Sequence, residues 1–534
     1  MSSESFVTPG ARNQTEVFAI HGADPEVLAY AMAKYSRSAL SMRESLTEIS
    51  AQRAEQFLNT FYFQYGHRSI ADLAHIAFSV ERLSLLAAIV LVDEQRWDGQ
   101  ERSTRYQNFL KSGWFFPDFG ADSASAQLYA ETIECLFGSY RRVNDAVFDA
   151  LRRRVACPEG TKPEAYERTL KARAFDVARY LLPLATNTSL GQIVNARTLE
   201  NQVSRLLSYP AAEVRDLGIK LREAATGPAW NVNAQAGQTF LEMLEASDPE
   251  LVAEAANLLT REVRTAPTLV KYAQPNDYLA QTQAELAQTA AEFLENQPIA
   301  ASPVVDLVEY TESLEVELAS TLLYSASHHP YRQIRDLVAT LPEARVNEII
   351  ELGLRHRGKH DEALRPFHAG AALRFDILMD TGGFRDMHRH RRCTQIIQPL
   401  TALHGYETPT SGDLGSSDED GYIDILIEAY CRADFQSAIK AAHAASAQIA
   451  LSTAPEAAQS ALYLLPLATR IRSLFKMDFA EAQYIIELRS GPAGHFSYRR
   501  IAWEMFLALQ RQHPALAKHI RVTDFTKPID LLQR

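Results

Sequence analysis

The sequence predicts a helix-rich α+β fold, with mixed helices and strands around a central sheet, built as two tandem copies. The chain has 534 residues, more than one hydrophobic core usually serves, so two or more domains are expected. The heptapeptide YLLPLAT occurs twice, at 180–186 and at 463–469. An identical stretch of this length is very unlikely to recur by chance in so short a chain.

The flanks of the two heptapeptides support a duplication. Arg205 and Arg489 follow the repeats at almost the same distance, and each is followed ten residues later by another arginine, Arg215 or Arg499. A coincidence between two leucine-rich core segments would not keep these flanks in register. A duplication with small insertions explains all of these features.

A boundary between the copies is predicted within AQTQAELAQTAAEFLENQPIAASP, residues 279–302, which is polar, rich in alanine and closed by prolines. We therefore expect a first domain at 1–285, a linker at 286–303 and a second, more divergent domain at 304–534. Both domains have an ordinary size.

Hydrophobic periodicity indicates that helices dominate. The segments 25–38, 196–208 and 497–512 have the spacing of amphipathic helices, while 85–97 is apolar enough to be either a buried strand or a helix. The mixture of the two patterns favours an α+β or mixed α/β architecture.

Composition excludes several classes of protein. The net charge of −12 disfavours general binding to nucleic acid or anionic membranes. The longest apolar run, residues 83–92, is about half of the ~20 residues that a membrane helix needs, and no signal-peptide pattern is present. The cysteines are scattered without CxxC spacing, which argues against a zinc ribbon or a disulfide framework and fits a reducing, cytoplasmic location: Cys135, Cys157, Cys393 and Cys431.

The densest candidate for a functional site is RDMHRHRRC, Arg385–Cys393. It places four arginines and two histidines within eight residues of an acidic protein. These positive charges repel one another unless a bound anion neutralises them, so a phosphate or a nucleotide is the natural partner. The alternative is a solvated basic face.

A metal site is not predicted from the histidines. His388 and His390 could form an HxH pair, and His356 and His360 have the i, i+4 spacing of helical ligands. However, no acidic or cysteine ligand stands at a supporting position nearby. The tripeptide Arg-His-Arg also occurs at 355–357, and taken alone it cannot be distinguished from the copy at 389–391.

A different cluster occurs in the first half, in QERSTRYQNF at 100–109. If this segment is extended, Ser103 and Arg105 lie on the same side of it. A hydroxyl beside a guanidinium is a plausible phosphate clamp. The alternative is a turn capped by the serine.

Two further stretches of the first half carry polar groups that could approach a ligand. YGHRS, at 65–69, places a histidine and a serine directly after a glycine, and VNARTLEN, at 194–201, begins a helix with amides and an arginine that suit a heterocycle or a phosphate. The alternatives are a structural histidine and a solvated helix face. The side chains concerned are His67, Ser69, Asn195, Arg197 and Asn201.

The order of these clusters resembles that of the flavin-dependent thymidylate synthases, whose signature is RHRxxSxNExSxRY. The first half matches the end of the signature with Glu101, Ser103, Arg105 and Tyr106, while Asp93, Glu94 and Gln95 stand where Arg-His-Arg is expected. The signature is thus incomplete in this half.

The second half resembles the start of the same signature. Its matching residues are Arg389, His390, Arg391 and Thr394, whereas Pro399, Thr401 and Ala402 replace the later serine, arginine and tyrosine. The resemblance covers most of both halves. It also selects 389–391 over 355–357, because only the former lies at the right distance before YLLPLAT.

The resemblance implies roles for individual residues. Positions that hold or act on deoxyuridylate are matched by Glu101, Ser103, Arg105, Arg179, Arg205, Arg389 and Arg489, with Ser103, Arg105, Arg205 and Arg489 as the catalytic candidates. Flavin positions are matched by His67, Ser69, Asn195, Arg197, Asn201, Arg389, His390 and Arg391. Two departures occur: Arg205 lies one residue closer to Asn201 than the family spacing implies, and Asp478, Ala480 and Tyr484 replace the flavin-binding asparagines and arginine in the second half.

What the resemblance implies about function is reductive methylation of dUMP to dTMP, with FAD as cofactor and with NADPH and methylenetetrahydrofolate as co-substrates. No cysteine nucleophile is required, and the chain has no GxGxxG loop that would mark a separate dinucleotide-binding domain. Family enzymes are homotetramers with shared pockets. The chain is therefore expected to be a pseudo-dimer that pairs into a pseudo-tetramer, with composite sites from both halves and half of the potential pockets dead.

Two other functions remain open from the sequence. The divided signature also fits a repurposed or inactive duplicate that binds a flavin or a pyrimidine nucleotide without synthase activity, because a fold does not imply a function. An RNA-binding module built on Arg385–Arg392 is disfavoured by the acidic net charge and by the lack of interleaved aromatic residues.

Overall fold

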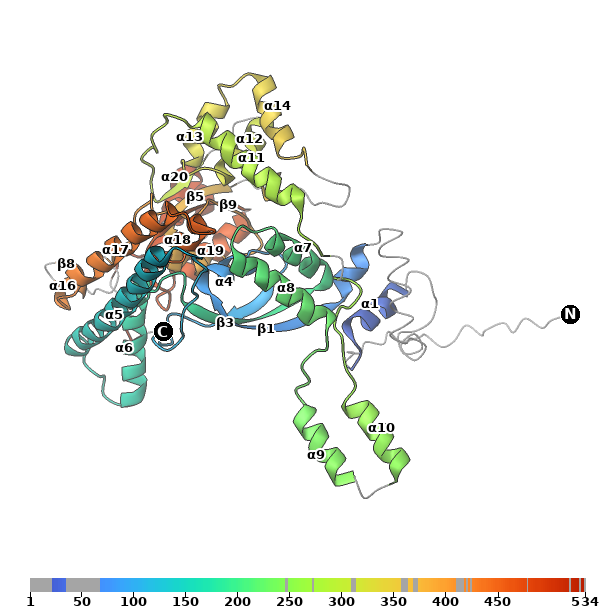
Figure 1. Ribbon diagram of the computed structural model, residues 1–534. Helices are drawn as coiled ribbons and strands as arrows, with labels where there is room; N and C mark the ends of the chain where they lie inside the picture. The colour runs from blue at the N-terminus through green and yellow to red at the C-terminus, as the bar shows by residue number, and fades with distance from the viewer. Residues whose placement is uncertain are drawn as a thin grey trace, which may run out of the picture. The chain divides into compact units, whose positions relative to one another are not determined.

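The computed structural model of the protein describes residues 22–34, 68–244, 248–270, 273–308, 314–356, 364–367, 373–409, 417–418, 421–422, 425–477, 479–517, 520–527 and 530–532. Figure 1 shows their helices and strands in order along the chain. Contacts divide the chain into two compact units: the first comprises parts of 1–76, 195–197 and 224–271, and the second comprises parts of 77–194, 198–223 and 272–534. These units do not coincide with the two halves expected from the repeat.

The first unit is helical. Its elements are α1 (Pro25–Lys34), the 3-10 helix η2 (Arg68–Leu73), α9 (Ala234–Leu244) and α10 (Pro249–Leu259). The carboxylate of Glu26 in α1 is buried and accepts hydrogen bonds from the backbone N–H groups of Thr268 and Leu269, at 2.9 and 2.7 Å. The helix expected at 25–38 is confirmed as far as Lys34, and the rest of that segment lies outside the described residues.

Two antiparallel sheets carry the same strand order in the two halves of the chain. The first has the order β1-β3-β2, and the second has β5-β9-β6 with β4 added at its edge. The strands are β1 (His75–Ser84), β2 (Asp98–Glu101), β3 (Asn187–Asn195), β4 (Val305–Leu307), β5 (Leu373–Asp380), β6 (Thr394–Ile397) and β9 (Arg470–Met477), with a separate small pair β7 (Ser417–Asp418) and β8 (Gly421–Tyr422). In each sheet the central strand lies just after a YLLPLAT copy.

The helices repeat in the same order. A short helix follows the first strand of each sheet, α4 (Leu85–Leu91) after β1 and α15 (Thr381–Met387) after β5, and a pair follows the central strand: α7 (Ala196–Leu207) and α8 (Ala212–Thr226), or α19 (Phe479–Ser490) and α20 (Phe496–Gln512). The side chains of Ser84 and Asp380 cap α4 and α15 by accepting a backbone hydrogen bond. The ambiguous segment 85–97 is therefore helical at its start, and the duplicated, helix-rich α+β fold is confirmed.

The two YLLPLAT copies pair with each other. They meet at an antiparallel bridge between Pro183 and Pro466. Each hydrogen bond across the bridge has its counterpart in the other copy: Leu184 N–H to Leu465 O at 2.9 Å and Leu467 N–H to Leu182 O at 2.9 Å, Ala185 N–H to Tyr463 O at 2.8 Å and Ala468 N–H to Tyr180 O at 3.1 Å. The repeat thus forms a local two-fold junction that joins the two halves within the second unit.

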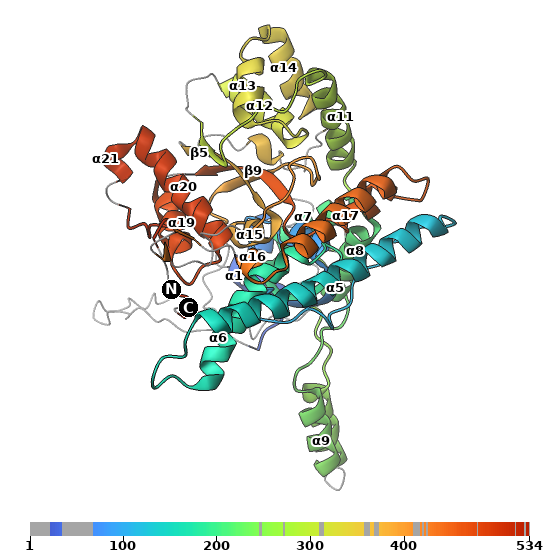
Figure 2. The ribbon, with the colours of Figure 1, turned by 90° about the vertical axis from the view of Figure 1, so that its left-hand side faces the viewer.

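Long helices pack beside this junction. Helix α5 (Ser123–Arg154) contacts α6 (Pro163–Ala178) of its own half and α17 (Arg432–Ala450) of the other, and Figure 2 shows α5 and α17 side by side. Asp434 of α17 accepts hydrogen bonds from Ser139 and Arg142 of α5 at 2.7 to 2.8 Å. The shorter elements of the unit are η3 (Arg179–Leu181), η4 (Arg365–Phe367), α16 (Ile425–Glu428), α18 (Ala457–Leu462) and α21 (Pro514–Ala517).

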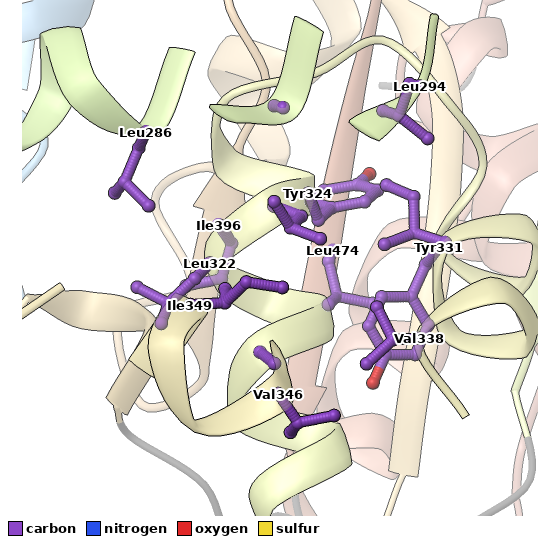
Figure 3. Close-up of a cluster of buried hydrophobic side chains, with 14 of the residues drawn as sticks. Leu286, Leu294, Leu322, Tyr324, Tyr331, Val338, Val346, Ile349, Ile396 and Leu474 are labelled. Carbon is purple, nitrogen blue, oxygen red and sulfur yellow. The ribbon is translucent and has the colours of Figure 1, made fainter. Parts of the chain in front are cut away.

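One hydrophobic core covers the second sheet (Figure 3). Four helices contribute to it, α11 (Asp277–Phe293), α12 (Leu314–Ser325), α13 (Tyr331–Val338) and α14 (Glu343–Leu352), together with Ile396 and Leu474 from strands β6 and β9. The segment 286–303, predicted as a linker, therefore begins inside α11, where Leu286 and Ala290 are buried. Burial of apolar side chains fixes this part of the segment, while the domain bounds at 285 and 304 stay a prediction.

Candidate anion-binding site

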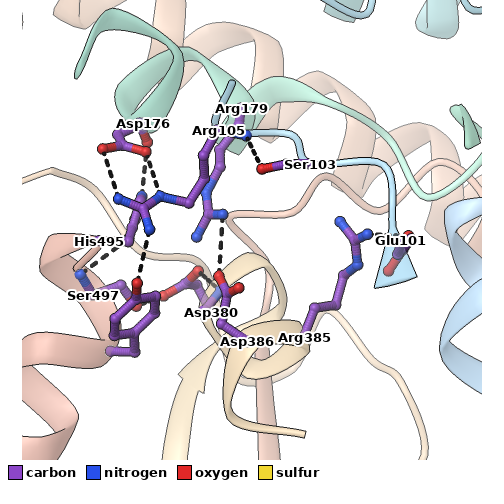
Figure 4. Close-up of polar contacts among 12 residues, drawn as sticks. Glu101, Ser103, Arg105, Asp176, Arg179, Asp380, Arg385, Asp386, His495 and Ser497 are labelled. Atoms are coloured by element: carbon purple, nitrogen blue, oxygen red, sulfur yellow. Dashed lines mark hydrogen bonds and ion pairs between the residues drawn. The ribbon is translucent and has the colours of Figure 1, made fainter. Parts of the chain in front are cut away.

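The site is centred on Asp386, at the end of α15, where arginines of both halves meet. Arg179 lies with its Nη1 3.4 Å from Asp386 Oδ2 (Figure 4). Burial opposes ionisation of Asp386, but the charges of Arg179, Arg389, Arg105 and Arg489 together hold the pKa of its carboxyl below the ordinary value. Two of these arginines precede the predicted boundary and two follow it, so the site is composite.

Arg105 is saturated by partners within the chain. Its Nε and Nη2 donate to the carboxylate of Asp176 at 2.8 and 3.3 Å, Nη2 also donates to Ala493 O at 3.1 Å, and Nη1 donates to Tyr498 Oη at 2.8 Å. Burial opposes its charge, yet the fully buried Asp176 raises the pKa of Arg105. Since four of its five N–H groups are in use, Arg105 fastens the first half to the second and is not a free phosphate clamp.

Ser103 lies in a turn rather than in an extended strand. The chain turns at Thr104–Tyr106, and Ser103 Oγ accepts a hydrogen bond from the backbone N–H of Arg105 at 3.2 Å. The expectation that Ser103 and Arg105 share one side of an extended segment is therefore wrong. The capped turn forms because the serine hydroxyl satisfies a backbone donor that the end of β2 leaves unpaired.

Arg179 offers the unsatisfied donors that Arg105 lacks. It begins η3, directly before the first YLLPLAT copy, and only 1% of it is exposed. Its Nε and Nη2 have no hydrogen-bond partner among the described residues. Buried donors of a charged group are costly when unpaired, so an anion at this position would satisfy Arg179.

Arg489 is held in place by a neutral histidine. Its Nε donates to His390 Nε2 at 2.7 Å, so that nitrogen carries no proton. The other ring nitrogen of His390 faces Glu481 at 3.7 Å, and burial lowers the pKa of His390. The remaining N–H groups of Arg489 make no hydrogen bond with the described residues and are available to a ligand.

A pocket next to this cluster is lined by both halves. Apolar and aromatic residues of the first half, together with one carboxylate, face basic residues of the second: Ile89, Val92, Trp97, Gly99 and Glu101 against Arg385, His388, Arg389 and Arg391. Arg391 stacks over the ring of Trp97 at 4.2 Å, and burial lowers the pKa of Arg391 to about 10. Its Nε has no partner in the described part of the chain, whereas Arg385 is paired with Glu101 (Figure 4). Within RDMHRHRRC, Arg385 and both histidines are buried, Arg391 is half-buried, and Arg389 and Arg392 are exposed, so only part of the basic cluster is a solvated face.

His388 is bound to a carboxylate of the other half. Its Nε2 lies 3.1 Å from Asp93 Oδ1, and Arg365 pairs with the same carboxylate. Burial lowers the pKa of His388 to about 4 in spite of Asp93, so its imidazole is neutral. In the residues that the structure describes, no group of three or more His, Cys, Asp or Glu side chains could hold a metal ion.

Arg205 has a different role from the expected one. Its Nη2 and Nε donate to Glu94 Oε1 at 2.7 and 3.0 Å, and Nη1 donates to Val90 O at 2.8 Å. Glu94 thus holds Arg205 in the way that His390 holds Arg489. The difference is that the carboxylate of Glu94 neutralises its arginine, whereas the imidazole of His390 is neutral. Arg205 is committed to this ion pair and is not among the arginines around Asp386.

The first unit brings together two stretches that the sequence assigned to a flavin. Arg197 Nη1 donates to Asp72 in η2 at 3.0 Å, and the Ala196 N–H donates to Ala74 O at 2.8 Å. Helix η2 includes Ser69, and Asn195 directly precedes α7, so the two stretches belong to the same unit and meet at Asp72 and Ala74. His67 and the side chain of Ser69 lie outside the described residues, while Asn201 is half-buried in the second unit.

Sequence reasoning missed Asp386 and Tyr498. Asp386 had a local signal, because it is the one acidic residue inside RDMHRHRRC. Tyr498 had none, since α20 brings it from far along the chain to the side of Arg105. Charge density along the sequence can reveal the first kind of residue but not the second.

Comparisons with known proteins identify the family. The sequence profile described as "Thymidylate synthase complementing protein" matches twice, at residues 19–227 and 306–515. A "UPF0159 protein" of Chlamydia muridarum is 27% identical over 94% of this chain and 91% of its own length, and a flavin-dependent thymidylate synthase of Clostridium tetani is 25% identical over 33% of this chain and 68% of its own. The solved flavin-dependent thymidylate synthase of Helicobacter pylori, complexed with FAD and dUMP, shows 18% identity and a TM-score of 0.25, covering 38% of this chain and 89% of that one. Since the two profile matches together span more than half of the sequence, the chain belongs to the thymidylate synthase complementing protein family and carries its domain twice.

Proposed function

We propose that the protein is a flavin-dependent thymidylate synthase with one composite site per chain. It would convert dUMP to dTMP with FAD, NADPH and methylenetetrahydrofolate. The observation that carries the proposal is the gathering of arginines from both halves around Asp386, in a member of this family. The solved Helicobacter pylori enzyme is complexed with FAD and dUMP, and the same two ligands are proposed for this chain.

The charge of the cluster suits a phosphate monoester. Arg105 is paired with Asp176, so Arg179, Arg389 and Arg489 are the cations that face Asp386, and Arg179 also faces the buried carboxyl of Asp380. The three arginines outnumber these two carboxyls, so the cluster stays positive, and a phosphate monoester carries about −1.5 to −2 at neutral pH. The unpartnered N–H groups of Arg179 and the free ones of Arg489 supply charge-assisted hydrogen bonds to its oxygens.

The lining of the adjacent pocket has the chemistry that part of a flavin nucleotide requires. Trp97 and the aliphatic side chains of Ile89 and Val92 give it an apolar wall, and Arg391 has an unpartnered buried nitrogen for an anionic or carbonyl oxygen. We assign Arg389 and Arg391 to the cofactor on this basis. A flavin role of Asn195 and Arg197, in the first unit, rests on the family resemblance alone. When bound, FAD would carry the hydride that NADPH supplies.

The residues of the chain would act through position and charge. His390, neutral and bonded to Arg489 Nε, fixes the guanidinium so that its remaining N–H groups can donate to the phosphate. Cys393 is not suited to be a nucleophile, because burial raises the pKa of its thiol to about 12. The chemistry therefore needs no covalent bond to this cysteine.

The counterpart of this site in the first half is proposed to be inactive. Arg205, which corresponds to Arg489, is neutralised by Glu94, and the turn residues of the second half lack the serine and arginine of the signature. One dUMP and one active flavin per chain are therefore expected.

A repurposed duplicate remains the second candidate function. The observation that favours it is the commitment of Arg105, the arginine of the signature, to Asp176 and Tyr498. Such a protein would bind a flavin or a pyrimidine nucleotide at the same pocket and form no dTMP.

The experiment compares two arginines that correspond in the two halves. The purified protein is loaded with FAD, its absorbance spectrum is recorded before and after addition of dUMP, and dTMP is then measured with NADPH and methylenetetrahydrofolate. Arg489→Ala should abolish dTMP formation while flavin stays bound, and Arg205→Ala should leave dTMP formation in the folded fraction.

The outcomes separate the candidates. A flavin spectrum that shifts with dUMP, without any dTMP, would favour the repurposed duplicate. A protein that takes up neither FAD nor dUMP would refute both. Loss of activity in Arg205→Ala alone would place the active site in the first half.

A further inference from the structure

Tyr498 is brought to the arginine cluster by the start of helix α20. The Nδ1 of His495 caps the helix by accepting the backbone N–H of Ser497 at 3.1 Å, and the Nε2 of the same ring lies 2.9 Å from Asp176 O. The start of α20 is thus tied to the end of α6. Tyr498 follows one residue after Ser497 and is only 4% exposed.

Its side chain contacts an arginine from each half. Tyr498 Oη receives a hydrogen bond from Arg105 Nη1 at 2.8 Å. The ring also lies 5.7 Å from the Arg105 guanidinium and 5.3 Å from that of Arg489. Both distances allow cation–π attraction, so one ring positions two arginines.

One hydrogen-bond donor in this contact, the O–H group of Tyr498, is not used. Arginine has only donors, so the tyrosine oxygen is the acceptor and its own O–H proton must be donated elsewhere. No acceptor for that proton exists among the residues that the structure describes. A buried hydroxyl left in this state is unfavourable, and the carboxylate of Asp386 in the same cluster is already shared by the arginines.

We propose that Tyr498 is a ligand-binding residue, whose hydroxyl donates to an anionic oxygen of the group bound by Arg179 and Arg489. The ligand class is a phosphate, free or as a monoester. This assignment deepens the proposed function, since it concerns the same site, but it requires only that the site binds an anion. Tyr498 also holds Arg105 and Arg489 in the orientation that the anion needs.

The test is calorimetric titration of the FAD-loaded protein with dUMP and, separately, with inorganic phosphate. Tyr498→Phe keeps the ring and removes the donor. It should weaken both ligands by roughly 10- to 100-fold, the range for a hydrogen bond to a charged group, with flavin occupancy unchanged. Tyr129→Phe is the matched control, because Tyr129 is also buried and its hydroxyl donates to Phe115 O at 2.8 Å.

Each outcome decides the assignment. Equal affinities for wild type and Tyr498→Phe, or an equal loss in Tyr129→Phe, would overturn it. If the wild type binds phosphate but not dUMP, and Tyr498→Phe weakens phosphate, the proposed synthase function fails while the role of Tyr498 stands. If the wild type binds neither, both fail. Should Tyr498→Phe unfold, Tyr498→His, which keeps a ring and a donor, should restore the fold and part of the affinity.

Discussion

Replacing Arg105 by alanine is expected to damage stability more than ligand affinity. The fully buried carboxylate of Asp176 would lose two hydrogen bonds, at 2.8 and 3.3 Å. Removing one partner of a buried ion pair costs about 3–5 kcal/mol, because the other charge stays buried without its counter-charge. The bonds to Ala493 O and Tyr498 Oη would be lost as well, each with about 0.5–1.5 kcal/mol. These contributions overlap, so a total of about 4 kcal/mol is expected.

The assay is urea unfolding followed by tryptophan fluorescence, with dUMP affinity measured in parallel. Asp176→Asn in the Arg105→Ala background should recover part of the lost stability, because the buried charge disappears with its partner. A loss of less than about 1 kcal/mol, combined with at least ten-fold weaker dUMP binding, would refute the reasoning. It would show instead that Arg105 is the free phosphate clamp implied by the family resemblance.

Three more predictions concern the neighbouring residues. Arg179→Gln should weaken dUMP binding by about 10- to 100-fold in a titration, since it removes unpartnered charged donors. An unchanged affinity would show that the N–H groups of Arg179 do not bind the ligand. Arg391→Ala should deplete bound flavin in the absorbance spectrum, and full occupancy would contradict the assignment of Arg391. Burial lowers the pKa of His388 in the folded protein to about 4, below the ordinary value of about 6.5. As the pH falls, the histidine of the unfolded chain is therefore protonated first. The free energy of unfolding should decrease by about 3 kcal/mol between pH 6.5 and pH 4. His388→Asn should flatten this part of the pH profile of the unfolding free energy, and an unaltered slope would exclude His388 as its source.

The duplication could be predicted from the sequence because an identical heptapeptide demands similar surroundings. The copies at 180–186 and 463–469 each precede the central strand of a sheet with the same order. Their pairing with each other could not be predicted, because it consists of backbone hydrogen bonds that leave no mark in the choice of side chains. The helix inside the expected linker was hidden for another reason, since α11 buries only one residue per turn of this alanine-rich segment, Thr282, Leu286 and Ala290.

Site residues could be predicted where charged residues are close together along the sequence. They could not be predicted where a contact with a residue far away in the sequence determines whether an arginine is available to a ligand. Arg389 and Arg391 were found through their neighbours in RDMHRHRRC. The commitments of Arg105 to Asp176 and of Arg205 to Glu94 depend on residues far away in sequence. A role taken over from the family requires that the guanidinium is not already bound in an ion pair. Only the folded structure shows which arginines meet this condition.

The junction between the two YLLPLAT copies has a consequence for how this protein can change. In an assembly of identical subunits, every substitution is copied into all equivalent positions, so no position can be improved for one purpose without being altered for the others. Here each copy of the heptapeptide faces its counterpart on the same polypeptide. Positions 94 and 390 are equivalent in the two halves, yet one is glutamate and the other is histidine. The two halves can therefore accumulate different substitutions at the same place of the fold.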